Sequence, residues 1–160
     1  MQNSKELVIL GIDPGNVRAG YGIIRKEGGS FVHVASGILE IGGAGEIGAQ
    51  LCALEKALKK IIKAHRPTIA GLERLFASNN AKPVMGVAEA RGIIHKVIFE
   101  SGIPLKELAP QTIKLSVTGN GRADKKAVAK MVGLILKIET KKLLDDTTDA
   151  LAIAIAAAGG

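Results

Sequence analysis

The sequence predicts an α/β protein built on one mixed, five-stranded sheet with helices on its faces. The first 40 residues contain three largely apolar segments joined by short turns, which is typical of an antiparallel meander. From residue 46 onward, segments with helical apolar spacing alternate with short apolar runs, which is typical of α/β units. The 160 residues contain neither an evident linker nor an internal repeat, so we expect a single domain over 1–160.

Three strands are predicted in the meander, at residues 7–12, 20–25 and 31–39. The first is fully apolar and stops at the turn sequence Asp-Pro-Gly at 13–15. The second and third are joined by the turn Glu-Gly-Gly-Ser at 27–30. Short connections of this kind favour antiparallel neighbours.

The remaining elements follow from apolar spacing and from the prolines. Apolar residues at 47, 51, 54, 58, 61 and 62 predict the first helix, with Cys52 beside this face as a small core residue, and Pro67 ends it. Two further buried strands are expected, at 68–73 and 105–108. Helices are expected at 46–64, 83–100, 110–115, 124–136 and 146–158.

Composition indicates the class of partner. Lys and Arg number 22 against 15 Asp and Glu, and the net charge of +7 favours a polyanion such as nucleic acid. The single cysteine excludes an intramolecular disulfide and indicates a reducing compartment. The sequence has no run of 18 apolar residues and its start lacks a basic-then-apolar signal, so we expect a cytoplasmic protein without membrane contact.

Four carboxylates stand in apolar settings. Asp13 ends the first strand and Glu73 the fourth, and these strands are plausible neighbours in a sheet of this order. Asp146 and Asp149 are three residues apart, so they share one face of the last helix. Clustered carboxylates need cations, and oxygen ligands without His or Cys suit Mg²⁺ or Mn²⁺. Two such ions roughly 4 Å apart clamp the attacking and leaving oxygens of a phosphoryl displacement.

Structural explanations exist for each of these acids. The Asp-Pro-Gly segment is a common turn, and Glu73 is near two possible ion-pair partners, Arg74 and Arg91. Asp146 is also a good helix N-cap, with Asp149 completing a capping box.

Basic residues open the helix at 124–136. Lys125 and Lys126 stand in its first turn, where the helix dipole prefers anions, so we expect one of them to face a phosphate. The preceding Gly-Asn-Gly-Arg would supply free backbone N–H groups for the same purpose, and Lys114 lies near this region. Phe76, in a protein with four aromatics, is placed in a loop where it could stack on an unpaired base. Solvated lysines and a phenylalanine folded onto the core are the alternatives.

A competing motif occurs at residues 43–48, where Gly-Ala-Gly-Glu-Ile-Gly matches the dinucleotide-binding pattern between a strand and a helix. Glu73 follows the first glycine by 30 residues, more than the usual spacing of about 20, and the preceding strands read as a meander. A chain with 20 glycines produces such matches by chance.

Four stretches of the chain resemble the RuvC-type crossover junction endodeoxyribonucleases, the bacterial Holliday junction resolvases of the ribonuclease H-like superfamily. They are ILGIDPGNVRAGYGII, GLERLFASNNAKPVMGVAEARG, PQTIKLSVTGNGRADKKAV and DDTTDALAIAIA. The resemblance implies a ribonuclease H-like fold and resolution of four-way DNA junctions in recombination and repair. It also implies two Mg²⁺ ions per active site, with Mn²⁺ as a substitute, and products with 5′-phosphate and 3′-hydroxyl ends. A homodimer that works beside a branch-migration motor is implied as well.

The resemblance assigns roles to individual residues. Four acids match the family's metal-binding positions: Asp13, Glu73, Asp146 and Asp149. Two lysines match its catalytic ones: Lys114 and Lys125. Phe76 matches the base-stacking aromatic, whereas Asp145 is an extra acid beside a matched position. The residues expected to bind DNA are Phe76, Arg74, Asn80, Lys114, Arg122 and Lys125.

The helix at 83–100 fits the dimer independently, because two apolar faces are expected on it. One face comprises Val84, Val87, Ala88 and Ile94. The other comprises Gly86, Ala90, Ile93 and Val97. One would cover the sheet and the other a partner, unless the helix is buried between layers of one domain.

Other functions stay open at this point. A nuclease of the related YqgF type acting on RNA, or a junction-binding protein without cleavage, would share these motifs. A sugar-kinase or actin-like reading of the Asp-Pro-Gly segment would require two such domains.

Overall fold

The computed structural model describes residues 6–15, 18–40, 45–75 and 81–159, without the side chains of 81–85. Its elements follow the predicted order, with one short addition before the last helix. They are β1 (Leu7–Pro14), β2 (Arg18–Glu27), β3 (Ser30–Glu40), α1 (Ile47–His65), β4 (Ile69–Glu73), α2 (Ala81–Glu100), β5 (Leu105–Leu108), α3 (Pro110–Thr118), α4 (Lys125–Leu136), the 3₁₀ helix η1 (Thr140–Lys142) and α5 (Asp145–Ala158).

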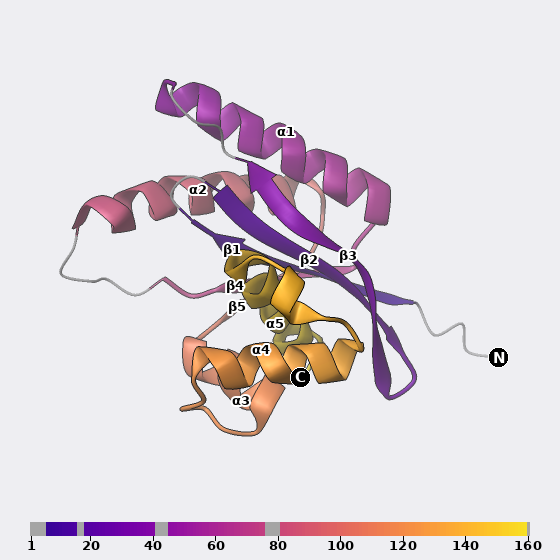
Figure 1. Ribbon diagram of the computed structural model, residues 1–160. Helices are drawn as coiled ribbons and strands as arrows, with labels where there is room; N and C mark the ends of the chain where they lie inside the picture. Colours follow the sequence, from indigo (N-terminus) through magenta and orange to yellow (C-terminus); the bar gives the residue numbers. More distant parts are fainter. Residues whose placement is uncertain (1–5, 16–17, 41–44, 76–80, 160) are drawn as a thin grey trace.

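The five strands form one mixed sheet in the order β3-β2-β1-β4-β5. The meander prediction is confirmed, because β1 pairs antiparallel with β2 and β2 with β3. The strands β4 and β5 extend the sheet in parallel from β1. Figure 1 shows α1 and α2 over one face of this sheet and α3, α4 and α5 over the other. The predicted α/β architecture with a five-stranded mixed sheet is therefore correct.

Side-chain alternation along β1 divides the strand between two cores. Leu10 and Ile12 point to the core shared with α1 and α2, whereas Ile9 points to the core built around α5. Gly11 also faces α5, and a Cβ placed there would lie 2.0 Å from the carbonyl oxygen of Ala150. The backbones of β1 and α5 therefore touch directly, which only glycine permits.

Several predicted boundaries were too short. The strand β1 continues through Asp13 and Pro14, because both still pair with β2. The helix α3 extends to Thr118 instead of 115, and it ends where Gly119 adopts a left-handed conformation with φ of 78°. Cys52 was expected in the core but is exposed on α1.

The two apolar faces predicted for α2 do not exist as separate faces. Among its described side chains, the buried hydrophobic ones are Ala90, Ile94, Val97 and Ile98, which mixes members of both predicted sets. Ala88, expected on an apolar face, is exposed. Phe99 is 84% exposed on the outer side of the helix.

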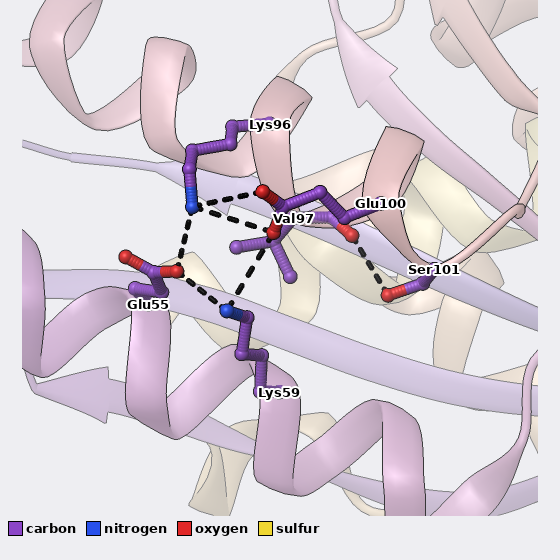
Figure 2. A network of polar contacts seen from close by, with 6 residues as sticks. All are labelled: Glu55, Lys59, Lys96, Val97, Glu100 and Ser101. Atoms are coloured by element: carbon purple, nitrogen blue, oxygen red, sulfur yellow. Dashed lines mark hydrogen bonds and ion pairs between the residues drawn. The ribbon is translucent and has the colours of Figure 1, made fainter.

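Ion pairs join α2 to α1 on the surface. Figure 2 shows Lys96 reaching from α2 to Glu55 of α1, with an Nζ–Oε1 distance of 2.8 Å, while Lys59 contacts the same oxygen at 2.6 Å. Hydrogen bonds from these two lysines lower the pKa of Glu55 to about 2. These ion pairs therefore link the two helices at the surface of the α1–α2 layer.

No described helix is long and apolar enough to cross a membrane.

Candidate active site

Asp13 and Glu73 meet at the carboxyl ends of two adjacent parallel strands. Ile12 of β1 is in register with Leu72 of β4, so the acid that follows each of them occupies the same level of the sheet. Odd-numbered residues of both strands face α5, as Gly11 and Gly71 show by their close approach to that helix. Both carboxylates therefore lie on the α5 face, as the proposed adjacency of the first and fourth strands requires.

Asp146 and Asp149 occupy the first turns of α5 on the same side. The alternative reading of Asp146 as an N-cap is wrong, because the helix begins at Asp145 and its N-cap is Leu144, without a side-chain cap. Gly20 of β2 brings this turn against the sheet, since a Cβ there would lie 1.9 Å from the carbonyl oxygen of Asp146. The two aspartates are thus held beside the strand ends by backbone contact.

A cavity of about 250 Å³ collects most of the predicted catalytic residues. Asp13, Glu73 and Asp149 line it together with both predicted lysines, Lys114 and Lys125. Its apolar wall is formed by Pro110, Ile113, Val128, Ala152 and Ile153. Asp146 is the one predicted carboxylate that is not among the lining residues.

The negative charges of these clustered carboxylates are unfavourable in the metal-free chain. Burial, followed by the negative charges of Asp149, Glu73 and Asp146, raises the pKa of Asp13 to about 7. Burial and the charge of Asp149 also raise the pKa of Glu73, and burial raises that of Asp149. Such a group of carboxylates is stabilised by any cation that enters it.

Lys125 supplies one such cation from within the protein. Its Nζ lies 3.3 Å from a carboxylate oxygen of Asp149 and 3.3 Å from one of Asp145. Both acids, four residues apart on α5, raise the pKa of Lys125 against a lowering by burial. The lysine in the first turn of α4 therefore faces carboxylates of the same chain, and Asp145, unexplained by sequence, is one of its partners.

Lys114 lies on α3, half-buried at the cavity. Its positive charge opposes the rise in the pKa of Glu73. Both lysines predicted to be catalytic are thus next to the carboxylates they were expected to serve.

The loop before α4 differs from expectation. The N–H of Gly119 donates to Leu115, that of Asn120 to Thr118, and that of Arg122 to the Asn120 side chain. These three amides are already hydrogen-bonded within the chain, so the prediction of N–H groups free for a phosphate is wrong for Gly119, Asn120 and Arg122. The exposed Arg122 lines a separate hollow beside α4.

The remaining predicted DNA contacts lie after β4. Arg74 is exposed directly after Glu73, with its backbone N–H bonded to Leu108. Phe76 and Asn80 lie outside the described residues.

Two arginines at the site were not predicted as site residues. Arg18 of β2 places its Nε 2.5 Å from Asp146 Oδ2. Arg91 of α2, which is buried, donates to the backbone carbonyl of Glu73 and forms an ion pair with Glu107 at 3.0 Å. Arg91 was considered only as a partner for the Glu73 carboxylate. For Arg18, a basic residue three positions after the Asp-Pro-Gly turn carries no sequence signal that identifies its partner.

The donor set fits a hard divalent cation, because it consists of carboxylate oxygens, and burial together with the neighbouring negative charges raises the pKa of Asp13 to about 7. Among the described residues, no three acids, histidines or cysteines are grouped closely enough to hold an ion as they stand. Two of the acids are instead paired with cations of the chain, Asp146 with Arg18 and Asp149 with Lys125.

Known proteins match this chain over most of its length. The family model described as "Crossover junction endodeoxyribonuclease RuvC" matches residues 9–157. The RuvC protein of Petrotoga mobilis is 36% identical over 92% of this chain and 91% of its own length. That of Brachyspira hyodysenteriae is 39% identical over 94% of this chain and 92% of its own.

Solved structures agree with the sequence matches. The T. thermophilus RuvC in complex with a Holliday junction substrate superposes with a TM-score of 0.89 at 25% identity, over 95% of this chain and 93% of that one. The yeast mitochondrial Holliday junction resolvase Ydc2 shares the fold, with a TM-score of 0.67 at 16% identity. The expected ribonuclease H-like architecture is thereby confirmed. This chain belongs to the RuvC family of crossover junction endodeoxyribonucleases.

Proposed function

We propose that this chain is a metal-dependent endonuclease that resolves four-way DNA junctions in recombination and repair, and that residues 1–160 form one nuclease domain. The observation that supports it most is the cavity where Asp13, Glu73 and Asp149 converge, with the pKa of Asp13 raised to about 7. Membership of the RuvC family supplies the substrate class.

Four acids would hold two Mg²⁺ ions, with Mn²⁺ as a substitute: Asp13, Glu73, Asp146 and Asp149. Bound there, the ions would supply charge for the phosphate and lower the pKa of the attacking water. Burial and the neighbouring carboxylates raise the pKa of Asp13 to about 7, so its charged form would be stabilised by a bound cation. Hydrolysis would leave a 5′-phosphate and a 3′-hydroxyl.

The two lysines would act on the phosphate itself. Lys114 and Lys125 flank the carboxylates, and each brings a positive charge to the cavity where negative charge develops during displacement. Ile113, Val128 and Ile153 form an apolar wall beside these charges.

Other residues would also contact DNA. Phe76 would stack on an unpaired base at the crossover, and Arg74, Asn80 and Arg122 would contact the DNA backbone. Phe76→Ala should therefore impair cleavage of intact junctions while metal binding is retained.

We propose that the active form is a homodimer in the cytoplasm, working beside a branch-migration motor. The outer side of α2 carries Ala88, Gly92, His95 and Phe99 at helical spacing, all exposed in the single chain. A second copy packed on this side would cover Phe99. A two-fold dimer also suits the pseudo-symmetry of a four-way junction, which places two equivalent strands for paired nicks.

The test is cleavage of a synthetic four-way junction with Mg²⁺, beside a linear duplex of the same sequence and a structured RNA. Nicks should appear in the junction alone, and DNA ligase should reseal them because the ends are 5′-phosphate and 3′-hydroxyl. Asp13→Asn should abolish nicking while junction binding in Ca²⁺ survives. Equal cleavage of duplex and junction would contradict structure selectivity, preference for RNA would favour a YqgF-type activity, and binding without nicking would contradict an enzyme.

A further inference from the structure

Arg18 approaches the metal site from a strand that supplies none of its acids. It is the first residue of β2, and its Nε lies 2.5 Å from Asp146 Oδ2. Arg18 and Gly20 are two residues apart, so their side-chain positions share one face of the strand. Gly20 is pressed against the backbone of Asp146, which fixes Arg18 beside the first turn of α5.

Asp146 interacts electrostatically with the other carboxylates of the cluster, although it forms an ion pair with Arg18. Its charge contributes to the raised pKa of Asp13. Asp13, Glu73 and Asp149 line the cavity, and Asp146 does not. The guanidinium thus holds the fourth carboxylate at the edge of the site.

We propose that Arg18 is a positioning residue that competes with a divalent ion for the carboxylate of Asp146. This inference rests on the metal site proposed above. A carboxylate oxygen that accepts a short, charge-assisted hydrogen bond cannot offer the same lone pair to an ion. Arginine stays protonated at all ordinary pH values, so an ion that takes this lone pair must displace the guanidinium rather than wait for it to lose its charge.

The exchange is easy because the pair is partly exposed. The side chain of Arg18 is 47% exposed and that of Asp146 27%, and exposed ion pairs are weak. Removing the competitor should therefore tighten ion binding roughly two- to tenfold, which is the range expected from losing one such pair and one nearby positive charge. A role in presenting Asp146 to the ion would have the opposite effect.

The first measurement is a titration of the metal-free protein with Mn²⁺, without DNA, read by the electron paramagnetic resonance of free Mn²⁺. Arg18→Gln should bind more tightly than the wild type. Arg25→Gln is the matched control: it removes the same charge from the same strand, roughly 20 Å away, where Arg25 pairs with Glu6 and Glu27. The control should bind as the wild type does.

A second measurement follows the native side chain. The Nε–Hε resonance of Arg18, assigned by its loss in Arg18→Gln, should shift as Mg²⁺ is added, and that of Arg25 should not. Unchanged or weaker Mn²⁺ binding by Arg18→Gln, or an Arg18 resonance unmoved at saturating Mg²⁺, would overturn the proposal.

Asp13→Asn separates this proposal from the site on which it rests. If Asp13→Asn binds Mn²⁺ like the wild type, the metal site is misplaced and both ideas fall. If Asp13→Asn loses binding while Arg18→Gln matches the wild type, only the role of Arg18 is wrong.

Discussion

Asp13→Asn should stabilise the metal-free protein at alkaline pH while it destroys the nuclease. Asp13 carries a pKa of about 7 in the folded chain against an ordinary 3.8. Its contribution to stability is therefore fully present below pH 3.8 and is lost as the pH rises through 7. Asparagine has nearly the same shape and no charge, so it avoids that loss.

The magnitude follows from the two pKa values. The difference corresponds to at most about 4 kcal/mol at 1.36 kcal/mol per pKa unit. Because the cavity is open to solvent, we expect roughly half of this, ~2 kcal/mol. For a chain of this length, that raises the unfolding temperature by about 4–8 °C. The gain should fall towards zero when the pH is lowered to 4, where the wild-type carboxyl is neutral in the folded state.

Thermal unfolding in EDTA, at pH 4 and pH 8, measures this directly. Glu139→Gln is the control, because it removes an exposed acid that pairs with Lys142 in the segment after α4. The control should show no alkaline gain. Added Mg²⁺ should stabilise the wild type and leave Asp13→Asn unchanged. An Asp13→Asn variant that is no more stable than the wild type at pH 8 would refute the electrostatic reasoning.

Three further predictions follow from contacts. Gly20→Ala should lower the free energy of unfolding by at least about 3 kcal/mol, because the added methyl group meets the backbone of α5. The control Gly29→Ala, where a Cβ has no atom within 4 Å, should change stability by less than about 0.5 kcal/mol. Equal melting curves for the two variants would contradict the close approach of Gly20 to α5. Asp145→Asn should slow junction nicking up to about fivefold, because Lys125 loses one of its two carboxylate partners. In a chain that already carries Lys125→Met, adding Asp145→Asn should cause no further loss of nicking, and a further loss would mean that Asp145 acts by another route. Phe99→Glu should shift a dimer towards monomer in light scattering, and an unchanged mass would place the dimer contact elsewhere.

The sequence predicted the fold and the convergence of the acidic residues better than it predicted the ion-pair partners of those acids. Asp13 and Glu73 could be paired because each ends an apolar strand, and parallel strands bring such ends together. The contact between Arg18 and Asp146 spans 128 residues and depends on how β2 crosses α5, which no local pattern encodes. Helix α2 was misread for a different reason: its small and apolar residues surround much of the helix, so periodicity alone could not choose the buried side.

The packing of α5 against the sheet also affects which substitutions such a nuclease can accept during evolution. At Gly11 and Gly20 the strands approach the backbone of α5 directly, so the spacing between the strand acids and the helix acids depends little on side-chain size at these two points. Substitutions in the α1–α2 layer can accumulate on the opposite face of the sheet without altering that spacing. Selection for a new cleavage preference can thus change surface residues while the spacing of the catalytic acids stays the same.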